Sequence, residues 1–91
     1  MPVTSKAKPG DRWSHTTPSG HKIVVIFDSV DGRGTELWEW SLWGPEGDFI
    51  NQDWRPNYDK AKDEAVMELR HRADRDKSIR FQRRFRLTRD K

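Results

Sequence analysis

The pattern of apolar and polar residues predicts two β-strands in the first half of the chain. Residues 21–27 end in the run Ile-Val-Val-Ile-Phe, and consecutive β-branched residues favour a pleated sheet over a helix. Residues 35–43 alternate, so that Trp38 and Trp40 share one face of their strand and Trp43 lies on the other. Between these segments, residues 31–34 (Asp-Gly-Arg-Gly) supply the glycines that a tight reversal requires. The two strands are therefore expected to pair antiparallel.

Two shorter segments complete the predicted sheet. Residues 11–15 precede a Pro-Ser-Gly turn, and residues 48–54 end just before Pro56, which stops a strand. The sequence thus predicts an α+β fold, in which a small three- or four-stranded antiparallel sheet over residues 11–54 is followed by one C-terminal helix with an Arg-rich end. Residues 1–10 are small and polar, and we expect them to be a disordered leader.

The helix is expected to run from about residue 57 to at least residue 74. A stripe of apolar residues about 140° wide would face the sheet, formed by Tyr58, Ala61, Ala65, Val66, Leu69 and Ala73. Beyond it, residues 76–91 form a basic C-terminal extension that is either helical or extended, outside a single domain of residues 11–75. If the helix breaks near Asp76, Ile79/Phe81 and Phe85/Leu87 alternate as extended chain. The absence of Gly and Pro after residue 73 favours a continued helix.

Composition restricts the class of protein. Ninety-one residues suit one domain, and 32% apolar residues is low, although five Trp and four Phe supply large apolar area. There is no cysteine, so a disulfide framework and Cys-ligated zinc are excluded. The longest apolar run is five residues, against the roughly 20 that a membrane helix needs. We expect a soluble, cytoplasmic protein with no membrane partner.

Candidate catalytic chemistry is sparse. The three histidines, His15, His21 and His71, are scattered and have no metal-ligand spacing. No Gly-rich phosphate loop and no G-x-S-x-G nucleophile motif occurs. The expectation is a protein that binds a partner without catalysis, cofactor or metal.

Charge is divided unevenly along the chain. Residues 1–69 carry eight Lys/Arg and twelve Asp/Glu (net −4), whereas residues 70–91 carry ten Lys/Arg and three Asp (net +7). Arginine suits bidentate contact with phosphate or carboxylate. The first interpretation is therefore a small nucleic-acid-associated protein whose Arg-rich helix contacts phosphates, and an acidic protein surface is the other partner considered. The candidate residues are Arg70, Arg72, Arg75, Lys77, Arg80, Arg83, Arg84, Arg86 and Arg89.

The tryptophans support an alternative function. One helix covers only one face of a sheet, so a Trp-bearing face would stay exposed, and exposed Trp is typical of binding hot spots. The alternative is an accessory or inhibitor protein, of the kind that viruses and phages encode, which docks on another protein through this face and the basic helix. A homodimer packed through the same aromatics is compatible with either function. The candidate interface residues are Trp38, Trp40, Trp43, Phe81 and Phe85.

Overall fold

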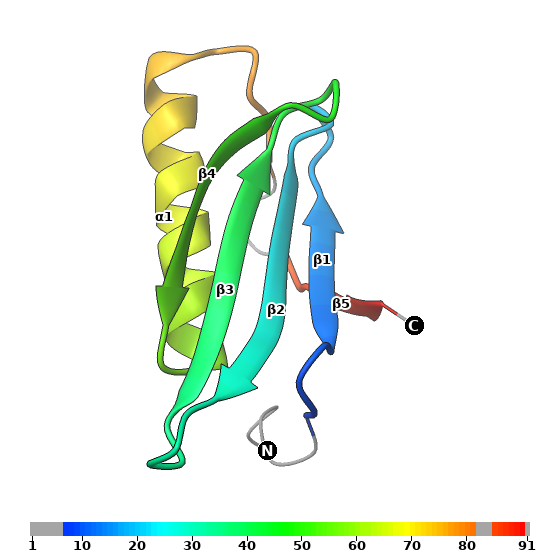
Figure 1. Ribbon diagram of the computed structural model, residues 1–91. Helices are drawn as coiled ribbons and strands as arrows, with labels where there is room; N and C mark the ends of the chain where they lie inside the picture. The colour runs from blue at the N-terminus through cyan, green and yellow to red at the C-terminus, as the bar shows by residue number, and fades with distance from the viewer. Residues whose placement is uncertain (1–6, 82–84, 91) are drawn as a thin grey trace.

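Four strands in chain order form an antiparallel meander, and a helix and a last short strand follow (Figure 1). The computed structural model describes residues 7–81 and 85–90. The sheet has the order β4-β3-β2-β1-β5. The element bounds are β1 (Arg12–Thr16), β2 (Lys22–Val30), β3 (Glu36–Trp43), β4 (Phe49–Arg55), α1 (Tyr58–Arg75) and β5 (Thr88–Asp90).

The two strongest predicted strands pair as expected. In the β2–β3 register Val25 lies opposite Trp40 and Phe27 opposite Trp38. The reversal between them is stabilised by the Asp31 carboxylate, which accepts hydrogen bonds from the backbone N–H groups of residues 33 and 35. Gly34 has a φ of +81°, a conformation that L side chains rarely adopt. The predicted antiparallel hairpin is confirmed.

The predicted helix is confirmed as α1, which lies against one face of the sheet. Asn57 caps its N-terminus, because the side-chain oxygen accepts from the backbone N–H of Lys60 at 2.8 Å. Ala61, Ala65 and Leu69 of the apolar stripe are completely buried. Their spacing places all three on the side of the helix that faces β2, β3 and β4.

The predicted three- or four-stranded sheet is wrong, because β5 adds a fifth strand beside β1. Arg12 pairs with Asp90 and Ser14 with Thr88 across this new edge. The favoured continuation of the helix is wrong as well, because α1 ends at Arg75. The Asp76 carboxylate accepts from both the backbone N–H and the hydroxyl of Ser78, and this local turn replaces the next helical turn.

The C-terminal segment, residues 76–81 and 85–90, is part of the core. Ile79 and Leu87 are each only 9% exposed, and Phe81 and Phe85 pack against the same apolar cluster. In Figure 1 the segment leaves the end of α1, passes behind the sheet and reaches β5. Two elements, α1 and this segment, therefore cover one face of the sheet. Among the described residues, no helix is long and apolar enough to cross a membrane.

Candidate functional site

The sheet has a covered face, under α1 and the C-terminal segment, and an open face on the other side. Trp38 and Trp40 belong to the covered face, with 0% and 2% of their surface exposed. Their indole N–H groups are satisfied, because Trp38 donates to Glu36 at 2.9 Å and Trp40 donates to Glu64 at 3.0 Å. These two tryptophans are core residues, out of reach of a partner.

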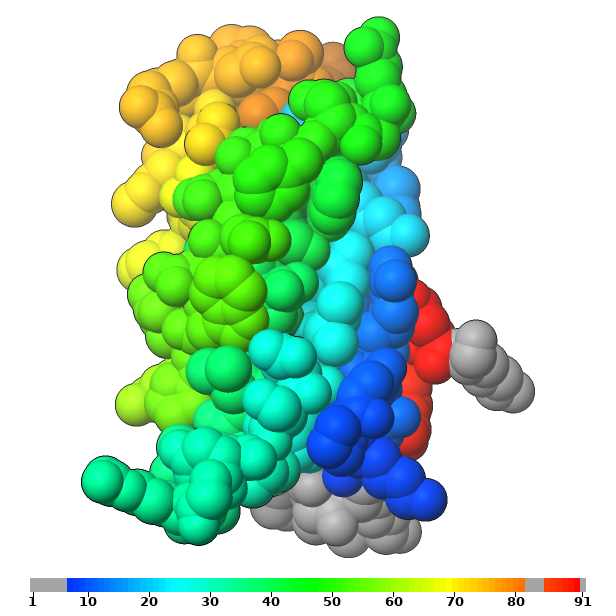
Figure 2. Space-filling model, in the orientation of Figure 1, coloured from blue at the N-terminus to red at the C-terminus, as the bar shows by residue number. Residues whose placement is uncertain are grey.

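The open face consists of three cross-strand rows that point away from α1. Each row takes one residue from each of β2, β3 and β4, since directly paired residues share a face. The rows are Lys22/Trp43/Phe49, Val24/Ser41/Gln52 and Ile26/Glu39/Trp54. In Figure 2 this face is turned to the viewer, and the side chains of β4, β3, β2 and β1 lie side by side with no other element across them.

Aromatic side chains stand at two corners of the open face. Phe49 is 52% exposed and meets Trp43 edge to face, with ring centroids 5.4 Å apart. The Trp43 indole N–H donates to the Ser41 hydroxyl at 2.9 Å, which fixes the orientation of the ring. Trp54, at the far end of β4, is 38% exposed. The Trp43 and Phe49 rings are thus held by each other and by Ser41, and the Phe49 and Trp54 rings are exposed.

A groove of about 420 Å³ runs over β1, β2 and β3 on the open face. Val24 is 3% exposed although it lies on this face, so it forms part of the groove floor. Trp43 and Pro45 line the end of the groove near the β3–β4 turn, and Ile26 and Glu39 line the other end. The open face thus has a groove in which apolar residues alternate with polar ones such as Lys22 and Ser41, with aromatic residues beside it.

Glu39 is the acidic residue that lines the groove, and Arg12 and Lys22 are the cationic residues that line it. Glu39 is partly buried, and within the described part of the chain it forms no ion pair. Burial raises the pKa of Glu39, and the nearby negative charge of Asp28 raises it further. At the opposite edge, Arg12 is already paired with Asp90 at 2.9 Å. The open face therefore presents an unpaired acid whose direct cross-strand neighbours, Ile26 and Trp54, are apolar.

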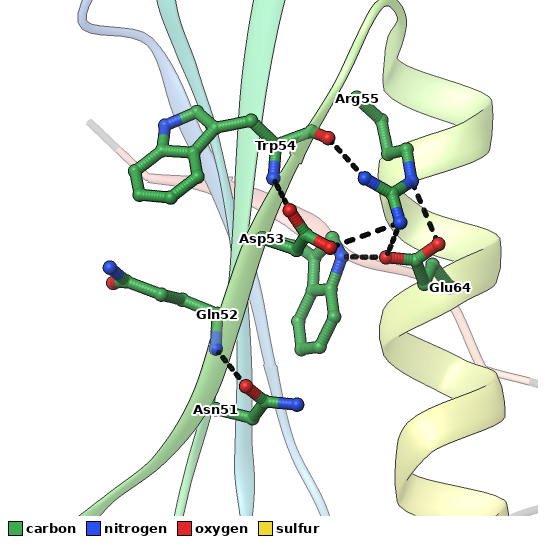
Figure 3. A network of polar contacts seen from close by, with 7 residues as sticks. Asn51, Gln52, Asp53, Trp54, Arg55 and Glu64 are labelled. Atoms are coloured by element: carbon green, nitrogen blue, oxygen red, sulfur yellow. Dashed lines mark hydrogen bonds and ion pairs between the residues drawn. The ribbon is translucent and has the colours of Figure 1, made fainter.

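One edge strand of the sheet, β4, has backbone groups that are occupied by its own side chains (Figure 3). The backbone N–H of Gln52 donates to the Asn51 side chain at 2.9 Å, and that of Trp54 donates to Asp53 at 2.8 Å. Arg55 donates to the Trp54 carbonyl as well. Because these groups are satisfied within the strand, β4 is a poor template for an added strand from another chain.

Arg55 also ties this edge to α1. Its guanidinium pairs with Glu64 at 2.6 Å and with Asp53 at 3.0 Å, and Glu64 in turn accepts from Trp40. The hydrogen bond from the Trp54 N–H, and after it Arg55, lowers the pKa of Asp53. The network anchors β4 from behind, while Trp54 itself faces the open side.

The Arg-rich residues lie away from the open face, and several are engaged within the protein. Arg72 pairs with Glu68 at 2.8 Å, and Arg89 pairs with Asp11 while its guanidinium lies 5.6 Å from the Trp13 ring centre. The backbone of Arg80 donates to and accepts from the Ser19 hydroxyl, at 2.9 and 3.0 Å. Side chains that are exposed to solvent are Arg70, Arg75, Lys77, Arg80 and Arg86. Arg83 and Arg84 lie outside the described residues.

One polar cluster was missed by the sequence-based reasoning. Ser19 in the β1–β2 turn lies 3.0 Å from His21 Nδ1 and 3.0 Å from the Thr17 hydroxyl. The same hydroxyl also bonds both backbone polar groups of Arg80, and His21 is 6% exposed. A serine with so many hydrogen-bond partners holds the C-terminal segment against the β1–β2 turn and is a poor nucleophile. The Pro-Ser-Gly sequence predicted the turn but gave no sign of this contact.

No group of three His, Asp or Glu side chains suited to a metal ion occurs within residues 7–81 and 85–90. Comparisons with known proteins found no matching family model, no matching curated protein and no matching solved structure. Function is therefore inferred from the open face and from the distribution of charge.

Proposed function

We propose that this protein is a non-catalytic binding protein that docks on another protein through the open face of its sheet. The observation that carries the proposal is the uncovered groove of about 420 Å³ beside the partly exposed ring of Trp43 and the exposed rings of Phe49 and Trp54. Accessible aromatic side chains next to a concave surface are the composition of an interface hot spot. The edge strand β4 is blocked, so docking would use side chains of the face and not strand addition.

Phosphate binding by the Arg-rich residues is the competing proposal. We prefer the open face because two of these arginines are already engaged in ion pairs: Arg72 pairs with Glu68 and Arg89 pairs with Asp11. Near the end of α1, the exposed Arg75 and Lys77 are interspersed with Asp74 and Asp76. Such alternation weakens the local positive potential on which phosphate contacts depend.

The proposal is tested by panning a random-peptide phage library on the immobilised protein and measuring the affinity of selected peptides by calorimetry. Trp43→Ala and Trp54→Ala should each weaken binding by about 30-fold, since truncating a hot-spot Trp costs about 2 kcal/mol or more. Met67→Ala is the matched control, because Met67 is 55% exposed but lies on α1. Circular dichroism first establishes that each variant is folded.

Two results would overturn the proposal. One is a library that yields no peptide above background, or peptides that bind both Trp variants as well as the wild type. The other is retention on duplex DNA by wild type and Trp variants alike, with log K falling against log[salt] at a slope of about −4 to −5, which corresponds to about five phosphate contacts. That pattern would assign the function to the Arg-rich residues.

A further inference from the structure

A protein that covers the groove together with Trp54 also covers Glu39, which lines the groove and pairs with Trp54. The register places Glu39 between Ile26 of β2 and Trp54 of β4, in a row that continues to Arg12 of β1. Both direct cross-strand neighbours of Glu39 are therefore apolar. A partner with only apolar side chains would remove the carboxylate from water without replacing its solvation. Burying an unpaired charge is strongly unfavourable.

Within the described residues, no side chain of the protein neutralises the charge of Glu39 through an ion pair. Glu39 has no ion-pair partner in the described ranges, and the nearest charge that affects it is Asp28, another acid. Asp28 is exposed and falls at the bulge where the β2–β3 register shifts. Arg12 and Lys22 line the same groove, but Arg12 pairs with Asp90 and neither forms an ion pair with Glu39 within the described residues. A partner that covers Glu39 can therefore supply the positive charge that Glu39 lacks.

Trp54 provides the second half of a cation site. It is the direct cross-strand neighbour of Glu39, and paired residues on one face have Cβ atoms about 4.5–5.5 Å apart. The indole is 38% exposed and carries a negative π-face, which attracts an ammonium or guanidinium group. One cation can thus contact the carboxylate and the ring together.

Building on the proposed function, we propose that the partner is a protein surface that places a Lys or Arg side chain between Glu39 and Trp54 and apolar side chains in the groove beside them. Glu39 supplies the ion pair, Trp54 stacks on the cation, and Val24, Ile26 and Trp43 receive the apolar side chains. This partner is basic and apolar, the opposite of the acidic surface that the Arg-rich sequence suggested. It lies across the face, because the β4 edge is closed to strand pairing.

Two random-peptide libraries that differ only in a fixed central residue, Arg in one and Glu in the other, test this inference. Panned in parallel on the full chain, the Arg library should yield binders and the Glu library none. The Arg peptides should bind Glu39→Gln at least about tenfold more weakly, as expected for a lost hydrogen bond to a charged group. Glu46→Gln, in the exposed β3–β4 turn, is the matched control and should bind as the wild type.

The outcomes separate this inference from the proposed function. Peptides that need Trp54 but are equally frequent in both libraries, or that bind Glu39→Gln unchanged, overturn the cation site and leave docking on the open face intact. Peptides that ignore Trp43→Ala and Trp54→Ala overturn both proposals. Duplex DNA that binds wild type but not Trp54→Ala would make the face a nucleic-acid surface and overturn both as well.

Discussion

Leu87 is the residue that decides whether the Arg-rich C-terminal segment belongs to the fold. Its side chain is 9% exposed and packs in the core cluster just before β5. Leu87→Ala removes three carbon atoms, which is worth about 2.4 kcal/mol at about 0.8 kcal/mol for each buried CH₂. The cavity adds to this cost, while its position at the rim of the core lets neighbours relax, so we expect a loss of about 2–3 kcal/mol in the free energy of unfolding.

Urea titration followed by tryptophan fluorescence measures this loss. The whole domain is expected to be stable by about 5–15 kcal/mol, so the variant stays folded without denaturant. With an m-value of about 1–3 kcal/mol/M, the midpoint should fall by about 0.7–3 M with an unchanged m-value. Arg86→Ala is the control, because Arg86 is the exposed neighbour, and its effect should stay within about 0.5 kcal/mol.

Equal midpoints for Leu87→Ala and Arg86→Ala would refute the reasoning. The segment would then be an arm that contributes nothing to the core. Its arginines would be free to follow a phosphate backbone, and the competing proposal would gain the mobile basic end that it requires.

Two further predictions concern the covered face. Leu69→Ala should lower the free energy of unfolding by about 2–5 kcal/mol, because Leu69 is fully buried at the centre of the α1–sheet contact; a urea midpoint close to that of wild type would contradict this packing. His15 stacks on Phe85 with ring centroids 4.1 Å apart, and burial lowers the pKa of His15 below its ordinary 6.5. The unfolded chain therefore binds the proton more readily, so stability should be complete above pH 6.5 and decline as the pH falls towards the folded-state pKa. Urea midpoints of His15→Asn should show less of this decline, and identical pH profiles would show that another group is responsible.

Local patterns were sufficient to predict the hairpin of β2 and β3 and the helix. The β-branched run of residues 23–26 and the glycines at 32 and 34 act over a few residues, and so does the spacing of Ala61, Ala65 and Leu69. These signals agree with the final packing, which is why they were reliable. They also show that one tryptophan-bearing face stays open.

The end of α1 and the fifth strand could not be predicted in the same way. Thr88–Asp90 is short and polar, and its pairing depends on Ile79 and Leu87 reaching a core built by distant residues. Asp76 carried the only local signal, since an Asp two residues before a Ser competes with the helix for backbone donors. The sequence also did not predict which face of the sheet α1 covers, because both faces of β3 carry Trp.

The two edges of the sheet are protected against strand pairing with another molecule by different means. This difference has a consequence for the order in which the strands form and open. On β4 the protection is local, made by side chains next to the donors that they satisfy, so it persists whenever the strand exists. The other edge strand is β5, which has three residues and covers β1. The hydrogen bond between Ser14 of β1 and Asp90 of β5 joins residues that lie 76 positions apart in the sequence. Contacts so distant in the chain form late, and short peripheral pairings open first. Each opening of β5 turns β1 into a bare sheet edge, so self-association of this protein is expected to begin at β1.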